Sequence, residues 1–168
     1  DNTRHLRDYD TETDLQELVA DNTFDTAAYV EGGQQFLYSS IGDAVNGDLL
    51  SGGGAEEGDT IVVEPGTYEE SVTISTQNVT LEGPNAGTPG YSDDRGEEAV
   101  ISRTDKPGSG GAAITITADE ITVDGFQIES DAQDGIAIAE IGSDVTITNN
   151  RISGVEGNTF GSGDGAGN

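Results

Sequence analysis

The sequence contains no cysteine, methionine or tryptophan, and only six of its 168 residues are lysine or arginine. The missing cysteine excludes disulfide bonds, thiolate catalysis and thiolate metal sites. No stretch approaches the ~20 apolar residues of a membrane span, so we expect no membrane insertion. The few basic residues are scattered, whereas phosphate binding needs a clustered basic surface. We therefore expect no nucleic acid partner.

Acidic residues dominate the charge. There are 33 aspartates and glutamates, and the formal net charge is -27 at pH 7. Such a chain repels itself in dilute buffer, but molar salt shortens the Debye length to roughly 3 Å and screens that repulsion. With Lys106 as the single lysine, the composition resembles that of extreme halophiles, especially haloarchaea. The alternative, an acidic DNA mimic, is disfavoured because the acids are spread along the chain.

Short apolar alternations recur at fixed offsets, which indicates an internal repeat. Residues 71–83 align with 113–125 at an offset of 42, and 121–130 align with 145–154 at an offset of 24. The aligned pairs at 42 are Val72 with Ile114, Ile74 with Ile116, Val79 with Ile121, and Leu81 with Val123. Ile114 and Ile116 are followed by Ile136 and Ile138 at an offset of 22. The repeat predicts order for most of the chain.

The alternation within each repeat has the period of β-strands. Such short strands cannot bury their inner faces alone, but they can do so by stacking on the next repeat, ~4.8 Å away. We therefore predict an all-β coil with Val72, Ile74, Val79 and Leu81 facing its interior. The offset of 42 is interpreted as one repeat of 22 to 24 residues plus an insertion of about 18, and we expect an inserted loop at 84–110.

Two segments carry a family resemblance. "GDTIVVEPGTYEESVTI" (58–74), followed by "NVTLEG" (78–83), resembles the opening repeats of right-handed parallel β-helix proteins of the pectin-lyase-like superfamily. "SSIGDAV" (39–45) resembles their N-terminal capping helix. The resemblance implies a right-handed single-stranded parallel β-helix with that cap. The helical positions are Ile41, Ala44, Val45 and Leu49, with Ser39 or Ser40 as N-cap.

The expected organisation has three parts. Residues 1–33 form an acidic arm that attaches to another subunit, with a short helix favoured at 11–22. Residues 34–156 form the β-helix, and 157–168 are a glycine-rich tail without the repeat. We expect the coil to continue beyond Asn168 in the natural protein.

Enzymes that the resemblance suggests would combine acidic calcium ligands with a basic residue, or would pair two aspartates. Asp119 and Asp124 are one such pair on paper, since inverting hydrolysis needs carboxyl groups ~6.5–9.5 Å apart. Many other pairs fit equally well on paper, and none of Arg103, Lys106 and Arg151 lies in a recognisable cluster. We assign no catalytic residue, no metal site and no cofactor, and calcium binding stays open.

Binding residues are easier to nominate. Tyr91 is the candidate for an exposed aromatic that stacks on a sugar, with Asp93 and Asp94 beside it in the inserted loop. Packing at the base of that loop is the alternative role for Tyr91. Asn78-Val79-Thr80 is the single N-glycosylation sequon. A structural asparagine at a coil corner is the alternative there.

The sequence favours a non-catalytic extracellular structural or adhesion module. This would be a β-helix rod on a haloarchaeal cell surface, or the spike or fibre of a halovirus virion. Its partners would be other protein subunits, bound through residues 1–33, and surface glycans, and spike-like relatives suggest a homotrimer. One alternative is the N-terminal part of a carbohydrate-active enzyme, similar to polysaccharide lyases or pectinesterases, with its active site downstream. The other alternative is a self-assembling scaffold.

The charge generates a first prediction. The free energy of unfolding will rise between dilute buffer and molar KCl by several kcal/mol, a large share of the ~5–15 kcal/mol of a typical domain, because salt screens the repulsion. Urea unfolding followed by circular dichroism at increasing KCl measures this. An unchanged free energy would show that self-repulsion does not limit stability.

Overall fold

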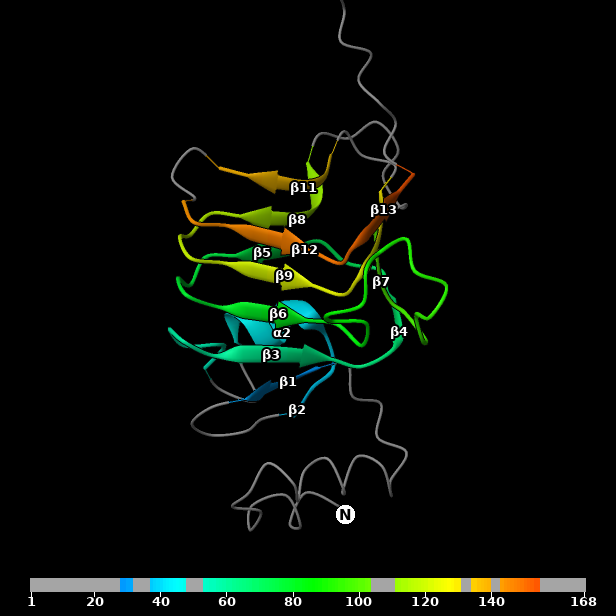
Figure 1. The fold of residues 1–168 in the computed structure, drawn as a ribbon. Coiled ribbons are helices and arrows are strands. Elements are labelled where there is room, and N and C mark those ends of the chain that lie inside the picture. The colour runs from blue at the N-terminus through cyan, green and yellow to red at the C-terminus, as the bar shows by residue number, and fades with distance from the viewer. Residues whose placement is uncertain are drawn as a thin grey trace, which may run out of the picture.

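The computed structural model describes residues 28–31, 37–47, 53–103, 111–130, 134–139 and 143–154. Strands in mostly parallel sheets make up nearly all of the regular structure in these ranges, with one short helix (Figure 1). The protein is therefore an all-β protein of parallel type, as the period-2 alternation predicts. None of the described helices is long and apolar enough to cross a membrane.

The strands form three sheets. Sheet I has the order β12-β9-β6-β3-β1-β2. Its strands are β1 (Ala28–Glu31), β2 (Leu37–Tyr38), β3 (Thr60–Val63), β6 (Thr80–Glu82), β9 (Thr122–Asp124) and β12 (Thr146–Thr148). Sheet II, in the order β13-β10-β7-β4, contains β4 (Gly66–Tyr68), β7 (Ala99–Arg103), β10 (Gln127–Ser130) and β13 (Arg151–Ser153). Sheet III, in the order β11-β8-β5, contains β5 (Val72–Ile74), β8 (Ala112–Ile116) and β11 (Asp134–Ile138).

From β3 onward the chain visits the three sheets in turn. It runs through β3, β4 and β5, then β6, β7 and β8, then β9, β10 and β11, and then β12 and β13. We call one such passage a circuit. Each circuit pairs in parallel with the preceding one, so strands far apart in sequence lie side by side (Figure 1).

The strand register follows the sequence repeat. Leu81 pairs with Val123 and Val72 with Ile114, at the offset of 42. Val123 pairs with Ile147 and Ile128 with Ile152, at the offset of 24. Ile116 pairs with Ile138 at the offset of 22. The predicted alignment is therefore confirmed for the pairs that lie in strands, while Val79 and Ile121 precede the paired strands β6 and β9.

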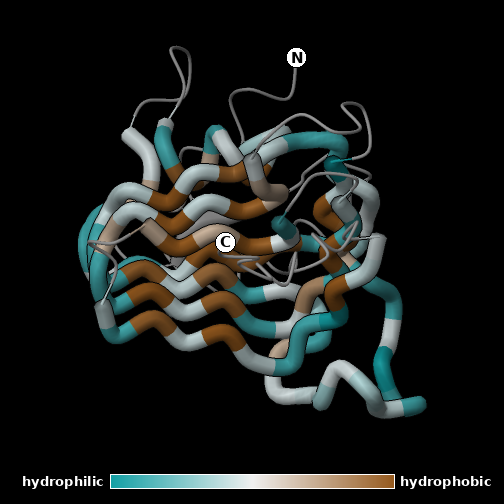
Figure 2. Tube along the Cα trace, turned by 90° about the horizontal axis from the view of Figure 1, so that it is seen from above, coloured by the Kyte–Doolittle hydropathy of each residue, from teal (hydrophilic) through white to brown (hydrophobic). Residues whose placement is uncertain are grey.

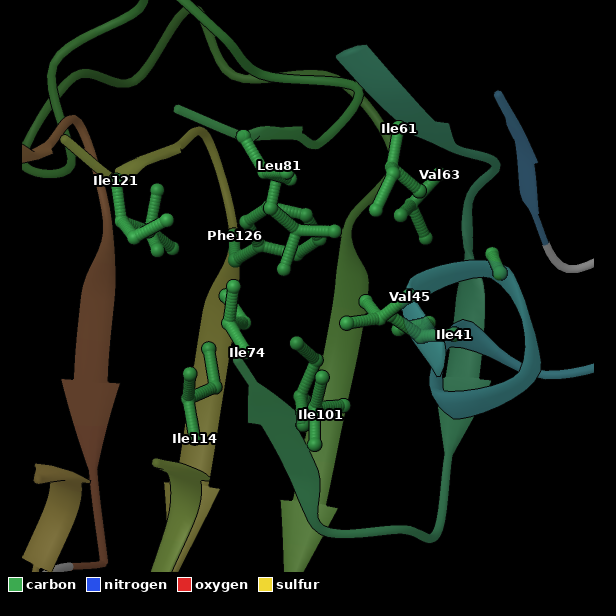
Figure 3. Packing of buried hydrophobic residues seen from close by; sticks show 14 of the residues in the cluster. Ile41, Val45, Ile61, Val63, Ile74, Leu81, Ile101, Ile114, Ile121 and Phe126 are labelled. Atoms are coloured by element: carbon green, nitrogen blue, oxygen red, sulfur yellow. The ribbon is translucent and has the colours of Figure 1, made fainter. Parts of the chain in front are cut away.

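The aligned residues form buried columns between the sheets. Ile61, Leu81 and Val123 are fully buried in sheet I, and Ile74 and Ile116 are fully buried in sheet III. Apolar residues alternate along each strand and repeat from strand to strand in Figure 2, and the side chains labelled in Figure 3 point toward one another. The four interior positions predicted from the sequence, Val72, Ile74, Val79 and Leu81, are all fully buried.

The columns are exposed at the last strand of each sheet. Ile138, Ile147 and Ile152 belong to the edge strands β11, β12 and β13, and they are 48%, 39% and 48% exposed. Their counterparts one circuit earlier are fully buried. Within the described residues, this edge is the most apolar exposed part of the three sheets.

Helix α2 (Ile41–Asn46) covers part of the core near the opposite edge, where it packs against β5 and the first strands of sheet I. Ser40 is its N-cap, since its Oγ accepts a hydrogen bond from the Asp43 N–H at 3.0 Å. The carboxylate of Glu70 accepts the N–H groups of Ile41 and Gly42, which satisfies two more first-turn donors. The predicted helix is confirmed up to Asn46, and its expected member Leu49 lies outside the described residues.

Two expected boundaries are wrong. Residues 99–103, expected inside a loop at 84–110, form β7, because sheet II needs a strand between β4 and β10. Residues 28–31, expected in an attachment arm at 1–33, form β1, which pairs antiparallel with β3 and covers an open sheet edge. The rest of that arm, including the helix expected at 11–22, lies outside the described residues.

The buried columns generate a second prediction. Leu81→Ala will lower the free energy of unfolding by about 2–5 kcal/mol, because Leu81 is fully buried between Ile61 and Val123 and leaves a cavity. Chemical unfolding in molar KCl measures the loss. Thr73→Ala, on an exposed position of β5, is the control and should change stability little. Equal effects of the two substitutions would contradict the stacked core.

Candidate functional site

Residues 83–98 join β6 to β7 and form the longest connection between strands that the structure describes in full. This side loop contains successive tight turns, closed by hydrogen bonds from Ala86 N to Gly83 O and from Ser92 N to Pro89 O. Glycine and proline at these points favour the turns. The loop lies outside the sheets, next to the connections of later circuits (Figure 1).

Arg95 is the centre of the side loop. Its side chain is only 2% exposed, and its Nε and Nη2 donate to the two carboxylate oxygens of Glu98 at 2.7 and 2.8 Å. Its Nη1 donates to the carbonyl oxygens of Thr88 at 2.9 Å and Asn149 at 2.6 Å. A further contact, at 3.4 Å, reaches the carbonyl of Phe126. Arg95 therefore ties the loop to the connections of the two following circuits.

Glu98 and Asn85 complete this network. Asn85 is buried, and its amide donates to Glu98 Oε2 and Glu97 O and accepts from Gly96 N. The hydrogen bond and charge of Arg95 lower the pKa of Glu98 below its ordinary value, against the opposing effect of burial. Arg95 and Glu98 thus form a bidentate ion pair that is largely buried, and Asn85 adds hydrogen bonds to it. Together these contacts fix the loop conformation.

Arg151 holds the loop from the other side. It lies on β13, and its Nε and Nη2 donate to the carbonyl oxygens of Gly90 and Ser92. Its Nη1 lies 3.6 Å from Glu98 Oε1. The expectation that Arg151 lies in no cluster is therefore wrong, because the loop folds back onto β13.

Glycine allows the loop backbone to approach the later circuits closely. A Cβ on Gly90 would lie 2.3 Å from the Asn150 carbonyl oxygen, and one on Gly125 would lie 2.2 Å from Ala86 N. Gly125 also has a φ of +83°, which disfavours other residues. These contacts place Tyr91, which follows Gly90, beside the last circuit.

An open depression of about 490 Å³ lies between the loop and the last circuit. It is lined by Pro89, Gly90, Tyr91, Asn149, Asn150, Arg151 and Ile152. Tyr91 is 90% exposed, whereas Asn149, Asn150 and Arg151 use side-chain donors in hydrogen bonds within the protein. The depression therefore offers an aromatic ring and the exposed apolar side chain of Ile152, above a polar network whose donors are already engaged.

Only one of the three predicted ligand-binding residues lies at this depression. Tyr91 lines it, so the alternative that this residue packs at the base of the loop is wrong. Asp93 and Asp94 are exposed on the same loop but do not line the depression. The described residues contain no group of three histidine, cysteine, aspartate or glutamate side chains that could hold a metal ion.

The pair Asp119 and Asp124 is not brought together. Asp119 accepts hydrogen bonds from Ser143 N and Oγ before β9, whereas Asp124 accepts from Asn149 Nδ2 and Gly87 N at its end. The left-handed corner at Glu120 and the whole of β9 lie between the two aspartates, and their side chains bind different partners, so the structure does not support them as a catalytic pair. Of the other basic candidates, Arg103 ends β7, and Lys106 lies outside the described residues.

The sequence reasoning missed Arg95, Glu98 and Asn85. A signal was available, because an Arg-x-x-Glu spacing in a chain with so few basic residues suggests a specific partner for the arginine. What the sequence could not show was the second partner of Arg95, the distant carbonyl of Asn149.

Comparison of the chain with protein-family models, curated proteins and solved structures gives no match.

The ion pair generates a third prediction. Glu98→Gln will lower the free energy of unfolding at neutral pH by about 1.5–3 kcal/mol, the usual contribution of hydrogen bonds to a charged group. Because the folded-state pKa of Glu98 is lowered, its contribution is present above the unfolded pKa of ~4.3 and is lost as pH falls through the folded value. The difference between wild type and Glu98→Gln should therefore shrink on acidification.

Chemical unfolding in molar KCl across this acidic range measures that difference. Glu97→Gln is the matched control, because the Glu97 side chain is exposed and makes no ion pair within the described residues. A wild-type-minus-variant difference that stays constant with pH would contradict the role given to Glu98.

Proposed function

We propose that this chain is a right-handed single-stranded parallel β-helix of the pectin-lyase-like type, with α2 as its N-terminal cap. Support comes from the order in which the chain visits the three sheets and from the matching register in all of them. The acidic composition supports an extremely halophilic source, a haloarchaeon or a halovirus.

The proposed role is that of a non-catalytic structural or adhesion module on a cell surface or virion. The observation that carries it is the side loop, which Arg95, paired with Glu98, fixes against the connections of the two following circuits while Tyr91 stays 90% exposed. A rigid exposed aromatic above a stacked support suits contact with an extended ligand outside the protein. Among the described residues, no carboxylate, histidine, serine or threonine side chain lines the depression.

Surface glycans are the proposed ligand. The faces of sugar rings carry C–H groups that pack on aromatic rings, and Ile152 adds a second apolar surface next to Tyr91. A polyanionic partner is disfavoured by the net charge of -27. The side chains of Asp93 and Asp94 lie outside the depression and have no part in this proposal.

The fold shortens the segment that is predicted to attach to another subunit. Residues 28–31 pair within their own sheet, whereas residues 1–27 and 32–33 lie outside the described part of the chain, so partner binding through them stays a prediction. The homotrimer stays a prediction in the same way.

One observation favours a second candidate, the self-assembling scaffold. Ile138, Ile147 and Ile152, on the edge strands of the three sheets, are 39–48% exposed. Exposed edge strands with apolar side chains pair readily with other strands. A binding experiment on this protein must therefore begin with a sample of known oligomeric state.

The fourth prediction tests glycan binding. The full chain in molar KCl will bind glycopeptides released from a haloarchaeal surface glycoprotein, and Tyr91→Ala will raise the Kd about 2- to 10-fold. Aromatic packing contributes ~0.5–1.5 kcal/mol, which corresponds to that range. Isothermal titration calorimetry measures the Kd, after sedimentation has established the oligomeric state.

Tyr91→Phe is the matched variant for this experiment, since it keeps the ring and should bind like wild type. Thr73→Ala controls for substitution at an exposed position on another sheet. Absence of binding by the wild-type chain, or equal binding by Tyr91→Ala, would contradict the proposed glycan contact.

A further inference from the structure

A column of left-handed residues runs along the connections that precede sheet I. Gly58, Asn78, Glu120 and Asp144 each lie two residues before a strand of this sheet, with φ values of +94°, +55°, +59° and +55°. Backbone hydrogen bonds join each corner to the next, from Gly58 N to Asn78 O, from Asn78 N to Asp119 O and from Glu120 N to Ser143 O. These residues occupy equivalent positions in four circuits.

The column does not require asparagine. Asparagine tolerates the left-handed region better than most residues, yet glycine, glutamate and aspartate occupy the same corner in the other circuits. A ladder of stacked asparagine amides is also absent from this corner, because the neighbours of Asn78 are Gly58 and Glu120. The structural role considered for Asn78 thus accounts for its backbone conformation but not for its amide.

The side chain of Asn78 differs from those of the other described asparagines in its hydrogen bonding. Asn46, Asn85, Asn149 and Asn150 each donate a side-chain hydrogen bond within the protein. Within the described part of the chain, the exposed Asn78 side chain makes no such bond, and only its backbone groups are engaged. The Asn78 amide therefore lies on an exposed residue and has no hydrogen-bond partner among the described residues.

Thr80, the threonine of the sequon, lies at a position of sheet I that is threonine in every circuit. Thr60, Thr80, Thr122 and Thr146 are paired with one another across sheet I, so every circuit has a threonine two residues after the corner. Only in the circuit of Asn78 does an asparagine precede that threonine at the required spacing. The sequon therefore occurs once, on an exposed corner.

We infer that Asn78 is a site of N-glycosylation, which rests on the proposed extracellular location. The co-reactant is an oligosaccharide linked to a lipid phosphate and presented by a membrane-bound transferase. The amide nitrogen of Asn78 forms a bond to the anomeric carbon, the bond from that carbon to the phosphate oxygen breaks, and the lipid phosphate leaves with the electron pair. The displaced amide proton passes to a base of the transferase.

The glycan would not cover the candidate ligand site. Asn78 precedes β6 and the side loop follows it, so the two lie at opposite ends of the strand (Figure 1). Val79, between Asn78 and Thr80, is fully buried, so the glycan is carried outward from the corner and the core is undisturbed. Glycosylation and Tyr91-mediated binding are therefore compatible in one molecule.

The fifth prediction is tested by mass spectrometry of the full chain produced in a haloarchaeal host that glycosylates its own surface protein. The intact mass will exceed the mass of the sequence, and the excess will map to the peptide that contains Asn78. Asn78→Gln and Thr80→Val will remove it, whereas Thr80→Ser will keep it. Asn46→Gln, an exposed asparagine outside any sequon, will leave it unchanged.

A second experiment tests whether Asn78 can be glycosylated regardless of where the host places the protein. The purified folded chain is incubated with envelope membranes that contain the transferase and its lipid-linked donor, and the same masses are recorded. Modification there, combined with retention of the chain inside the host, would support the site and contradict the proposed extracellular role. An unmodified Asn78 peptide in both arms, or an excess that persists in Asn78→Gln, would overturn the inference.

Discussion

The structure depends on one interaction, the packing of aliphatic side chains directly above one another in successive circuits. Leu81 contributes little to a core through its own three-residue strand, but between Ile61 and Val123 it becomes fully buried. Hydrophobic burial of this kind favours folding in proportion to the apolar area removed from water. Because every buried position needs a partner one circuit away, the register of all three sheets is fixed together.

This arrangement separates the inside of the protein from its outside. Alternate residues on each strand face the core, and the others are left for solvent, where a large surplus of carboxylates is tolerated in high salt. The same separation leaves the connections free to vary. The loop at residues 83–98 and the exposed corner at Asn78 are variations of this kind, and each places a chemically distinct group on the surface.

The side loop shows how a long connection becomes rigid without joining a sheet. Arg95 is buried against Glu98 and also donates to the carbonyl oxygen of Asn149. The cost of burying its charge is offset by a carboxylate in bidentate contact and by carbonyl acceptors for its other donors. Arg151 donates to the carbonyl oxygens of Gly90 and Ser92, which holds the backbone on both sides of Tyr91 and lowers the entropic cost of ordering the loop on binding.

The sequence by itself determined the strand period, the interior residues and the pairing register, because alternation and repeat offsets are local properties of the chain. Leu81 opposite Val123 could be read in this way. The position of β7, the pairing of β1 with β3 and the Arg95 network were decided only by the tertiary structure. Each of these depends on groups brought together from distant parts of the chain, by an open sheet edge or by carbonyl oxygens that any residue could supply. No side-chain pattern in the sequence records such contacts.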